Sequence, residues 1–237
     1  MPNQYSNYDD YARRGMDNTD YLAFRHVRDL DVLRNKVILD LGCGAGRSSR
    51  FLKDLDNDVT GIDISLSAIE RSSLIDPEGK YLHISRTEPL PFVDGAFDAV
   101  FSSWMVLEEG DDAVLLNTLR ECNRVLSDAG IAVIITNTPE FYCGDWLSCD
   151  VNHEENTPPL ISGQKVRVTL VPEGQVLEDY YRSDEHYRTL FKKSGFVVER
   201  SDHPMGRGDD PVEWRDELDK PPYVVYTLRK DEYGDII

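Results

Sequence analysis

The sequence predicts an α/β fold in which a doubly wound, mostly parallel sheet carries helices on both faces. Apolar runs that resemble strands alternate with segments of helical period along most of the chain. The runs are apolar throughout, as in strands buried on both faces. The first run enters a glycine cluster and continues as a helix, in VILDLGCGAGRSSRFL at 37–52. Such turns hold nucleotide-like ligands at the carboxyl ends of parallel strands.

The expected elements follow one another without a repeat or a low-complexity linker. We expect helices at 19–34, 46–55, 65–74, 111–126 and 184–193. We expect strands at 37–41, 59–62, 81–84, 99–102, 131–136, 196–199 and 223–228. Ser65 is a suitable N-cap for the helix that follows it, and Gly195 is a suitable stop after helix 184–193.

The alternation breaks after Pro139. Residues 140–162 show no periodicity, and two strand-like runs follow them at 166–170 and 176–181. The sequence Pro172-Glu173-Gly174 separates these runs, so we expect an inserted β-hairpin after the fifth strand.

Composition limits the classes of partner. The 237 residues include 44 Asp and Glu against 26 Lys and Arg, a formal net charge of -18. This charge disfavours nucleic acids and anionic membranes, which bind basic faces. No apolar run approaches the ~20 residues of a membrane span. The N-terminus lacks the apolar core of a secretory signal. The four cysteines suggest no disulfide framework. We expect a cytoplasmic protein, monomeric or homodimeric, whose acidity reflects either a high-salt source or simple solubility.

Two carboxylates indicate which nucleotide-like ligand the glycine turn holds. Asp40 stands two residues before Gly42, where it would repel a pyrophosphate and suit a cationic ammonium or sulfonium group. Asp63 ends the second expected strand and can accept hydrogen bonds from both hydroxyls of a ribose. The pattern predicts a nucleoside with a cationic tail, and S-adenosylmethionine fits that description.

Four stretches resemble the class I S-adenosylmethionine-dependent methyltransferases of the small-molecule type. They are VILDLGCGAGRSSRFL, GIDIS, EPLPFVDGAFDAVFSSWMVLE and ECNRVLSDAGIAVII, and together they span about residues 37–135. The resemblance implies a Rossmann-like fold with a seven-stranded sheet whose last strand is antiparallel. It also implies in-line methyl transfer from S-adenosylmethionine to an oxygen or nitrogen of a small molecule.

The resemblance assigns cofactor-binding roles to positions near the carboxyl ends of the strands. The positions are Tyr11, Asp40, Gly42, Cys43, Gly44, Asp63, Ile64, Thr87 and Ser102. The glycine turn and Asp40 would line the methionine end, Asp63 would hold the ribose and Ile64 would pack on the adenine. The backbone carbonyl of Ser102 would accept from the amino group. Tyr11 belongs to an N-terminal segment expected as a lid over the cofactor, as a tail packed on the core, or as a disordered tail.

One position departs from the family pattern. Where many relatives carry an aspartate that accepts from the adenine amino group, this chain has Arg86, which cannot accept. Thr87 or Glu88 is expected to substitute, or the backbone alone reads the adenine.

Glu108 and His153 are the candidate catalytic residues. Glu108 follows the fourth strand, where many small-molecule methyltransferases have histidine, so it can act as a base or grip a cationic acceptor. Its alternative is a solvated charge that opens the next helix. His153 lies in the insertion, on the expected acceptor side, or is a surface histidine. The spacing of Cys143, Cys149 and His153 matches no common zinc pattern, so we expect no metal site.

We therefore expect one methyltransferase domain with a small-molecule acceptor. Its alternatives are a protein or peptide methyltransferase and a non-catalytic module that binds S-adenosylmethionine. The expected parts are an N-terminal lid and helix (1–34), a cofactor-binding core (35–138), an acceptor-side insertion (139–182), and the last helix and strands (183–237).

Overall fold

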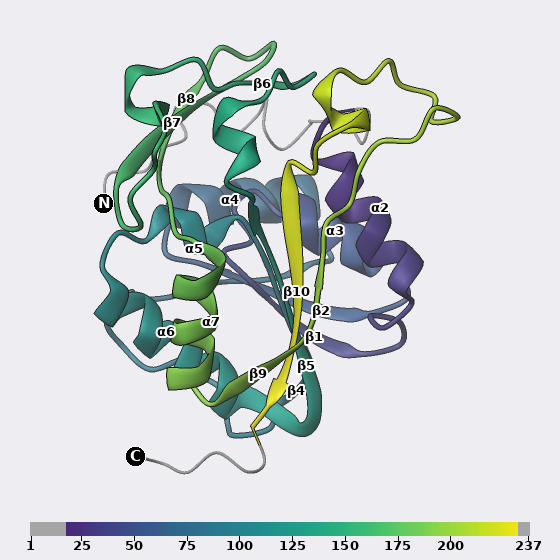
Figure 1. Cartoon of the computed structure of the whole chain (residues 1–237). Coiled ribbons are helices and arrows are strands. Elements are labelled where there is room, and N and C mark those ends of the chain that lie inside the picture. Colours follow the sequence, from purple (N-terminus) through teal and green to yellow (C-terminus); the bar gives the residue numbers. More distant parts are fainter. Residues whose placement is uncertain (1–17, 232–237) are drawn as a thin grey trace.

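The computed structural model describes residues 18–231, which form a seven-stranded sheet with helices on both faces (Figure 1). The strands are β1 (Val37–Leu41), β2 (Asp58–Asp63), β3 (Lys80–His83), β4 (Phe97–Ser103), β5 (Leu126–Asn137), β9 (Phe196–Asp202) and β10 (Tyr223–Lys230). Their order is β3-β2-β1-β4-β5-β10-β9. Strand β10 runs antiparallel to β5 and β9, and strands β1 to β5 pair in parallel. The predicted doubly wound, mostly parallel sheet with one antiparallel strand is confirmed.

Helices bury apolar side chains against each face of the sheet. The helices are α2 (Tyr21–Leu30), α3 (Arg47–Lys53), α4 (Leu66–Ile75), α5 (Met105–Glu108), α6 (Asp112–Val125) and α7 (Asp184–Lys193). Helices α2 and α3 contribute Phe24 and Leu52 to the core on one face. Helices α6 and α7 contribute Leu119 and Phe191 to the core on the other face. Within residues 18–231, no helix combines the length and the apolar character needed to cross a membrane.

Local sequence signals set several of the element ends. Ser65 caps α4, because its hydroxyl accepts a hydrogen bond from the amide of Ala68 at 3.3 Å. Gly195 follows α7 with a φ of +81°, which glycine adopts without strain. Strand β5 differs from the prediction: it begins at Leu126, immediately after α6, because Leu126 pairs with Phe97 of β4. Residues 127–130, which lie between the predicted helix 111–126 and the predicted strand 131–136, are therefore part of this strand.

The insertion forms a second, three-stranded antiparallel sheet beyond the carboxyl ends of the main strands, at the top of Figure 1. Its strands are β6 (Cys149–Asp150), β7 (Lys165–Leu170) and β8 (Val176–Tyr180). The predicted hairpin is confirmed as β7 and β8, and the two-residue β6 is an addition too short to show a period. Short 3₁₀ helices lie at Glu140–Cys143, Glu154–Asn156 and Asp216–Leu218.

Strand β8 carries a buried carboxyl group into the joint between the insertion and the main domain. Asp179 is only 6% exposed. It lies close enough to the hydroxyls of Tyr142 and Tyr187 to interact with them electrostatically. Burial raises the pKa of Asp179 to about 7. An ionised Asp179 therefore opposes the packing of this joint.

We predict that Asp179→Asn stabilises the protein at pH 8 and not at pH 4. The folded-state pKa lies above the unfolded value of about 4, so the penalty grows as the pH rises between these values and is complete above pH 7. The expected gain at pH 8 is on the order of 2 kcal/mol, measured as the change in free energy of unfolding in urea. An equal effect at both pH values, or one matched by the exposed control Asp219→Asn, would contradict this explanation.

Candidate functional site

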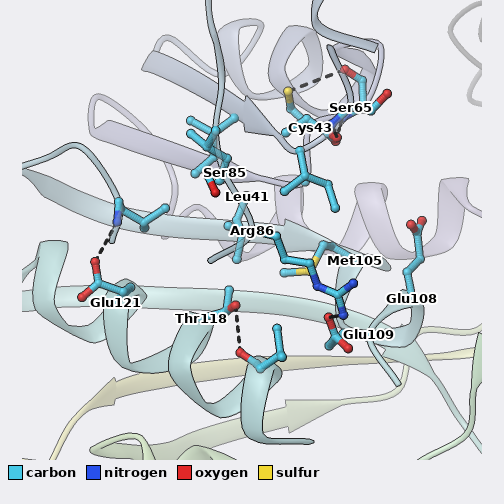
Figure 2. Close-up of a pocket in the computed structure, with 18 of the residues that line it drawn as sticks. Leu41, Cys43, Ser65, Ser85, Arg86, Met105, Glu108, Glu109, Thr118 and Glu121 are labelled. Atoms are coloured by element: carbon cyan, nitrogen blue, oxygen red, sulfur yellow. Dashed lines mark hydrogen bonds and ion pairs between the residues drawn. The ribbon is translucent and has the colours of Figure 1, made fainter. Parts of the chain in front are cut away.

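A cavity of about 990 Å³ opens at the carboxyl ends of β1 and β2. One wall is the glycine turn after β1 with the end of β2, and the opposite wall comprises residues 84–90, α5 and α6 (Figure 2). Small-molecule sites commonly measure roughly 300–1,000 Å³. The cavity is therefore large enough for a nucleoside ligand together with a small second molecule.

The glycine turn is tied to the neighbouring strand through its backbone. The amides of Gly42 and Cys43 both donate to the carbonyl of Ile62, at 2.9 and 3.0 Å. Gly42, Gly44 and Gly46 have φ angles of +72°, +52° and +79°, in the left-handed region that favours glycine.

These three glycines serve different purposes. A Cβ at Gly42 would lie 2.6 Å from the side chain of Met105, and one at Gly46 would lie 2.7 Å from the hydroxyl of Tyr81. The close packing of Met105 and Tyr81 therefore leaves no room for a side chain at either position. A Cβ at Gly44 would meet no atom within 4 Å, and Gly44 lines the cavity. The bare backbone at Gly44 thus leaves space for a ligand.

Asp63 joins the end of β2 to the glycine turn. One carboxylate oxygen accepts from the amide of Gly44 at 2.9 Å, and the other accepts from the amide of Ser65 at 2.7 Å. Burial raises the pKa of Asp63 although these amides oppose the shift. Asp63 lines the cavity, and each of its oxygens retains a lone pair that can accept from a ligand hydroxyl.

Asp40 lies one layer behind the cavity wall. It is fully buried, and one oxygen accepts from the hydroxyls of Ser48 and Ser49 at 2.7 and 2.5 Å. The other oxygen is buried without a partner in the described structure. Burial raises the pKa of Asp40 to about 6. Ser48 lines the cavity, so it stands between Asp40 and a ligand.

Some of the remaining residues predicted to bind the cofactor line the cavity, and others do not. Cys43, Ile64 and Thr87 line the cavity together with the residues above. Ser102 is buried and does not line it, whereas the next residue, Ser103, does. Tyr11 lies outside the described residues. These assignments remain predictions of the sequence.

The two predicted catalytic residues border different cavities. Glu108 ends α5 and lines the cavity of the glycine turn. His153 borders a second cavity of about 580 Å³ within the insertion. One nitrogen of its ring, Nε2, lies 3.0 Å from the hydroxyl of Thr169. The structure therefore brings Glu108, and not His153, to the predicted cofactor residues.

An ion pair that the sequence did not indicate lines the main cavity. Arg86, on the loop after β3, contacts the carboxylate of Glu109, which follows α5 (Figure 2). Glu109 is further fixed because its other oxygen accepts from the amide of Asp111 at 2.7 Å. The sequence distinguishes Arg86 only as a departure from the family pattern, and it carries no signal for Glu109.

The charged residues that line this cavity are predominantly acidic. Its acidic residues are Asp63, Glu70, Glu88, Glu108, Glu109 and Glu121, and its basic residues are Arg47, Arg86 and Arg120. Two of the three arginines already neutralise carboxylates, since Arg47 pairs with Asp20 at 2.7 Å and Arg86 pairs with Glu109. The electrostatics of the cavity therefore favour a ligand with positive charge.

Comparison with known proteins agrees with this geometry. Residues 39–134 match a family model described as a methyltransferase domain. An uncharacterized methyltransferase of Synechocystis sp. is 31% identical over 109 residues, 46% of this chain and 50% of that protein. A 2-methyl-6-phytyl-1,4-hydroquinone methyltransferase of Synechocystis sp. is 38% identical over 102 residues, 41% of this chain and 31% of that protein. The matches thus span half or less of these two relatives.

A solved structure extends the likeness to the whole fold. An S-adenosylmethionine-dependent methyltransferase from Mesorhizobium loti matches with a TM-score of 0.64 at 20% identity, over 91% of this chain and 100% of that chain. The predicted resemblance to class I methyltransferases is confirmed, and S-adenosylmethionine stays the predicted cofactor. The residues present fit this cofactor, because Gly44 leaves space and Asp63 offers acceptors for a ribose.

We predict that Gly44→Ala weakens binding of S-adenosylhomocysteine, the demethylated form of S-adenosylmethionine, at least about tenfold, because the added methyl group enters the open space of the cavity. The left-handed backbone should cost about 1 kcal/mol of stability. Gly174→Ala is the matched control, since Gly174 has a φ of +71° and equally open surroundings in the β7–β8 turn. Calorimetric titration and urea unfolding should show the same strain in both variants and a binding loss in Gly44→Ala alone. Equal binding by the two variants would refute a role for Gly44 in the cofactor site.

Proposed function

We propose that this chain, which carries the methyltransferase domain of class I S-adenosylmethionine-dependent enzymes in residues 39–134, transfers a methyl group to an oxygen or nitrogen of a small molecule. The observation that carries the proposal is the turn in which Asp63 holds the amide of Gly44 at the edge of a cavity of about 990 Å³. This arrangement gives a ribose two carboxylate acceptors beside bare backbone.

The protein's part in such a reaction is mainly positional. When bound, S-adenosylmethionine supplies a methyl group already activated on a cationic sulfur. The chain must therefore orient the acceptor in line with that group and exclude water. The Arg86–Glu109 pair closes one side of the cavity, and the insertion lies beyond the same ends of the strands (Figure 1).

Glu108 is the proposed acid–base residue. Its carboxylate borders the cavity and can accept a proton from a hydroxyl or an ammonium acceptor. The acidic lining favours a neutral or cationic acceptor over an anionic one. His153 borders the cavity within the insertion, so a role for it requires an acceptor that reaches there. The net charge of -18 favours small molecules over nucleic acids.

We predict that the wild-type protein binds S-adenosylmethionine and S-adenosylhomocysteine but not NADH in calorimetric titrations. Asp63→Ala should bind both sulfur nucleotides roughly 10- to 100-fold more weakly, because the ribose hydroxyls lose their hydrogen bonds to a charged group. Asp58→Ala is the control at the opposite end of β2, where Asp58 pairs only with Lys80 at the surface. If neither sulfur nucleotide binds at millimolar concentration, with or without candidate acceptors, the proposed function fails.

A second measurement distinguishes the acceptor classes. We expect tritium from methyl-labelled S-adenosylmethionine to appear in the small-molecule fraction of a cell extract treated with the protein. Transfer should fall in Glu108→Gln and persist in Glu140→Gln, which alters a carboxylate of the insertion outside the main cavity. Label confined to protein would instead indicate the peptide methyltransferase. Tight binding without any transfer would indicate a binding module.

A further inference from the structure

A buried arginine lies behind the acidic wall of the cavity. Arg182 stands between β8 and α7, at the point where the insertion returns to the main domain, and its side chain is 0% exposed. A buried guanidinium is costly unless its donors are paired. The partners of Arg182 therefore show what this residue holds in place.

All three nitrogens of the guanidinium donate to one short segment. Nη1 donates to the carbonyl of Val106 at 3.2 Å, and Nη2 donates to the carbonyl of Glu109 at 2.5 Å. Nε donates to a carboxylate oxygen of Asp112 at 2.9 Å. Arg182 thus satisfies carbonyls at the end of the four-residue helix α5 and ties that helix to the start of α6.

The segment that Arg182 holds carries one wall of the cavity. Met105, Glu108 and Glu109 from this segment line the cavity. Met105 also packs against Gly42 of the glycine turn, and Glu109 pairs with Arg86 of the loop after β3. A helix of four residues has little stability of its own. Its position must therefore come from tertiary contacts such as those of Arg182.

The segments before and after the β7–β8 hairpin are also held together close to Arg182 and Asp112. The hydroxyl of Ser162 lies 2.7 Å from Nδ1 of His186 and accepts from the amide of Ser183 at 3.0 Å. The other ring nitrogen of His186 lies 2.7 Å from the second carboxylate oxygen of Asp112. The ring of Tyr180 occupies the space where a side chain on residue 110 would project. The insertion therefore has a polar and an apolar contact with the wall.

We infer that Arg182 is a positioning residue that fixes the 105–109 wall of the cofactor cavity and links it to the insertion. The inference rests on the proposed function, because it assigns the wall to cofactor and acceptor binding. A shift of the hairpin moves Arg182, and Arg182 carries the backbone of Glu109 with it. The position of the insertion, on the predicted acceptor side, thereby determines the geometry of the 105–109 wall.

Arg182→Lys tests this role while keeping the charge. A lysine ammonium cannot reach three acceptors in the fixed geometry of a guanidinium. We expect amide hydrogen exchange at 105–110 to accelerate roughly tenfold, without a change in the strands of the main sheet. We also expect S-adenosylhomocysteine to bind roughly tenfold more weakly, by calorimetry. Arg188→Lys is the matched control, because Arg188 pairs with Asp184 on the surface of α7.

The two readouts separate the possible failures. Unchanged exchange at 105–110, or an affinity within twofold of the wild type, would overturn the positioning role. If wild-type protein fails to bind S-adenosylhomocysteine, the proposed function fails, and the exchange measurement alone decides whether Arg182 holds the wall. Should Arg182→Lys not fold, Asp112→Asn weakens the same contacts from their half-exposed end and should give the same pattern to a smaller degree.

Discussion

The attachment of the glycine turn to the end of β2 is the constraint on which the site depends. Two amides of the turn donate to the carbonyl of Ile62, and Asp63 accepts from the amide of Gly44. This geometry requires left-handed backbone at Gly44, so β1 cannot lead straight into α3 with ordinary side chains. The result is a rigid edge from which the cavity extends toward α5 and α6. On the opposite wall, the guanidinium of Arg182 donates to the backbone carbonyls of Val106 and Glu109.

The charges of the two walls differ in how they are compensated. On the glycine side, Asp63 is held by backbone amides and Asp40 by two serine hydroxyls, and no arginine pairs with either carboxylate. On the opposite side, Glu109 is paired with Arg86. The carboxylates of Asp40 and Asp63 therefore offer a cationic ligand negative charge that no arginine neutralises. The proposed orientation of S-adenosylmethionine, with the methionine end toward Asp40, is consistent with this asymmetry.

The sequence predicted the features that depend on neighbours along the chain. Strand β1 and helix α7 have the predicted bounds, because each has a strong period or a clear stop signal. The glycine turn was predicted because its residues are contiguous. Glu109 and Arg182 were not predicted as site residues, because their roles depend on contacts across more than 20 and 70 positions of the chain. Helix α5 is too short for its period to be recognised.

The two carboxylates on the glycine side also act on each other. Each is buried, and the negative charge of Asp63 contributes to the raised pKa of Asp40, which reaches about 6. A cation placed beside them favours both ionised forms and lowers both pKa values. Ligand binding and ionisation of Asp40 are therefore linked, so a cationic ligand removes the destabilisation that the buried charges impose. Under the proposed function, the carboxylates that destabilise the ligand-free protein would also favour a cationic cofactor over a pyrophosphate.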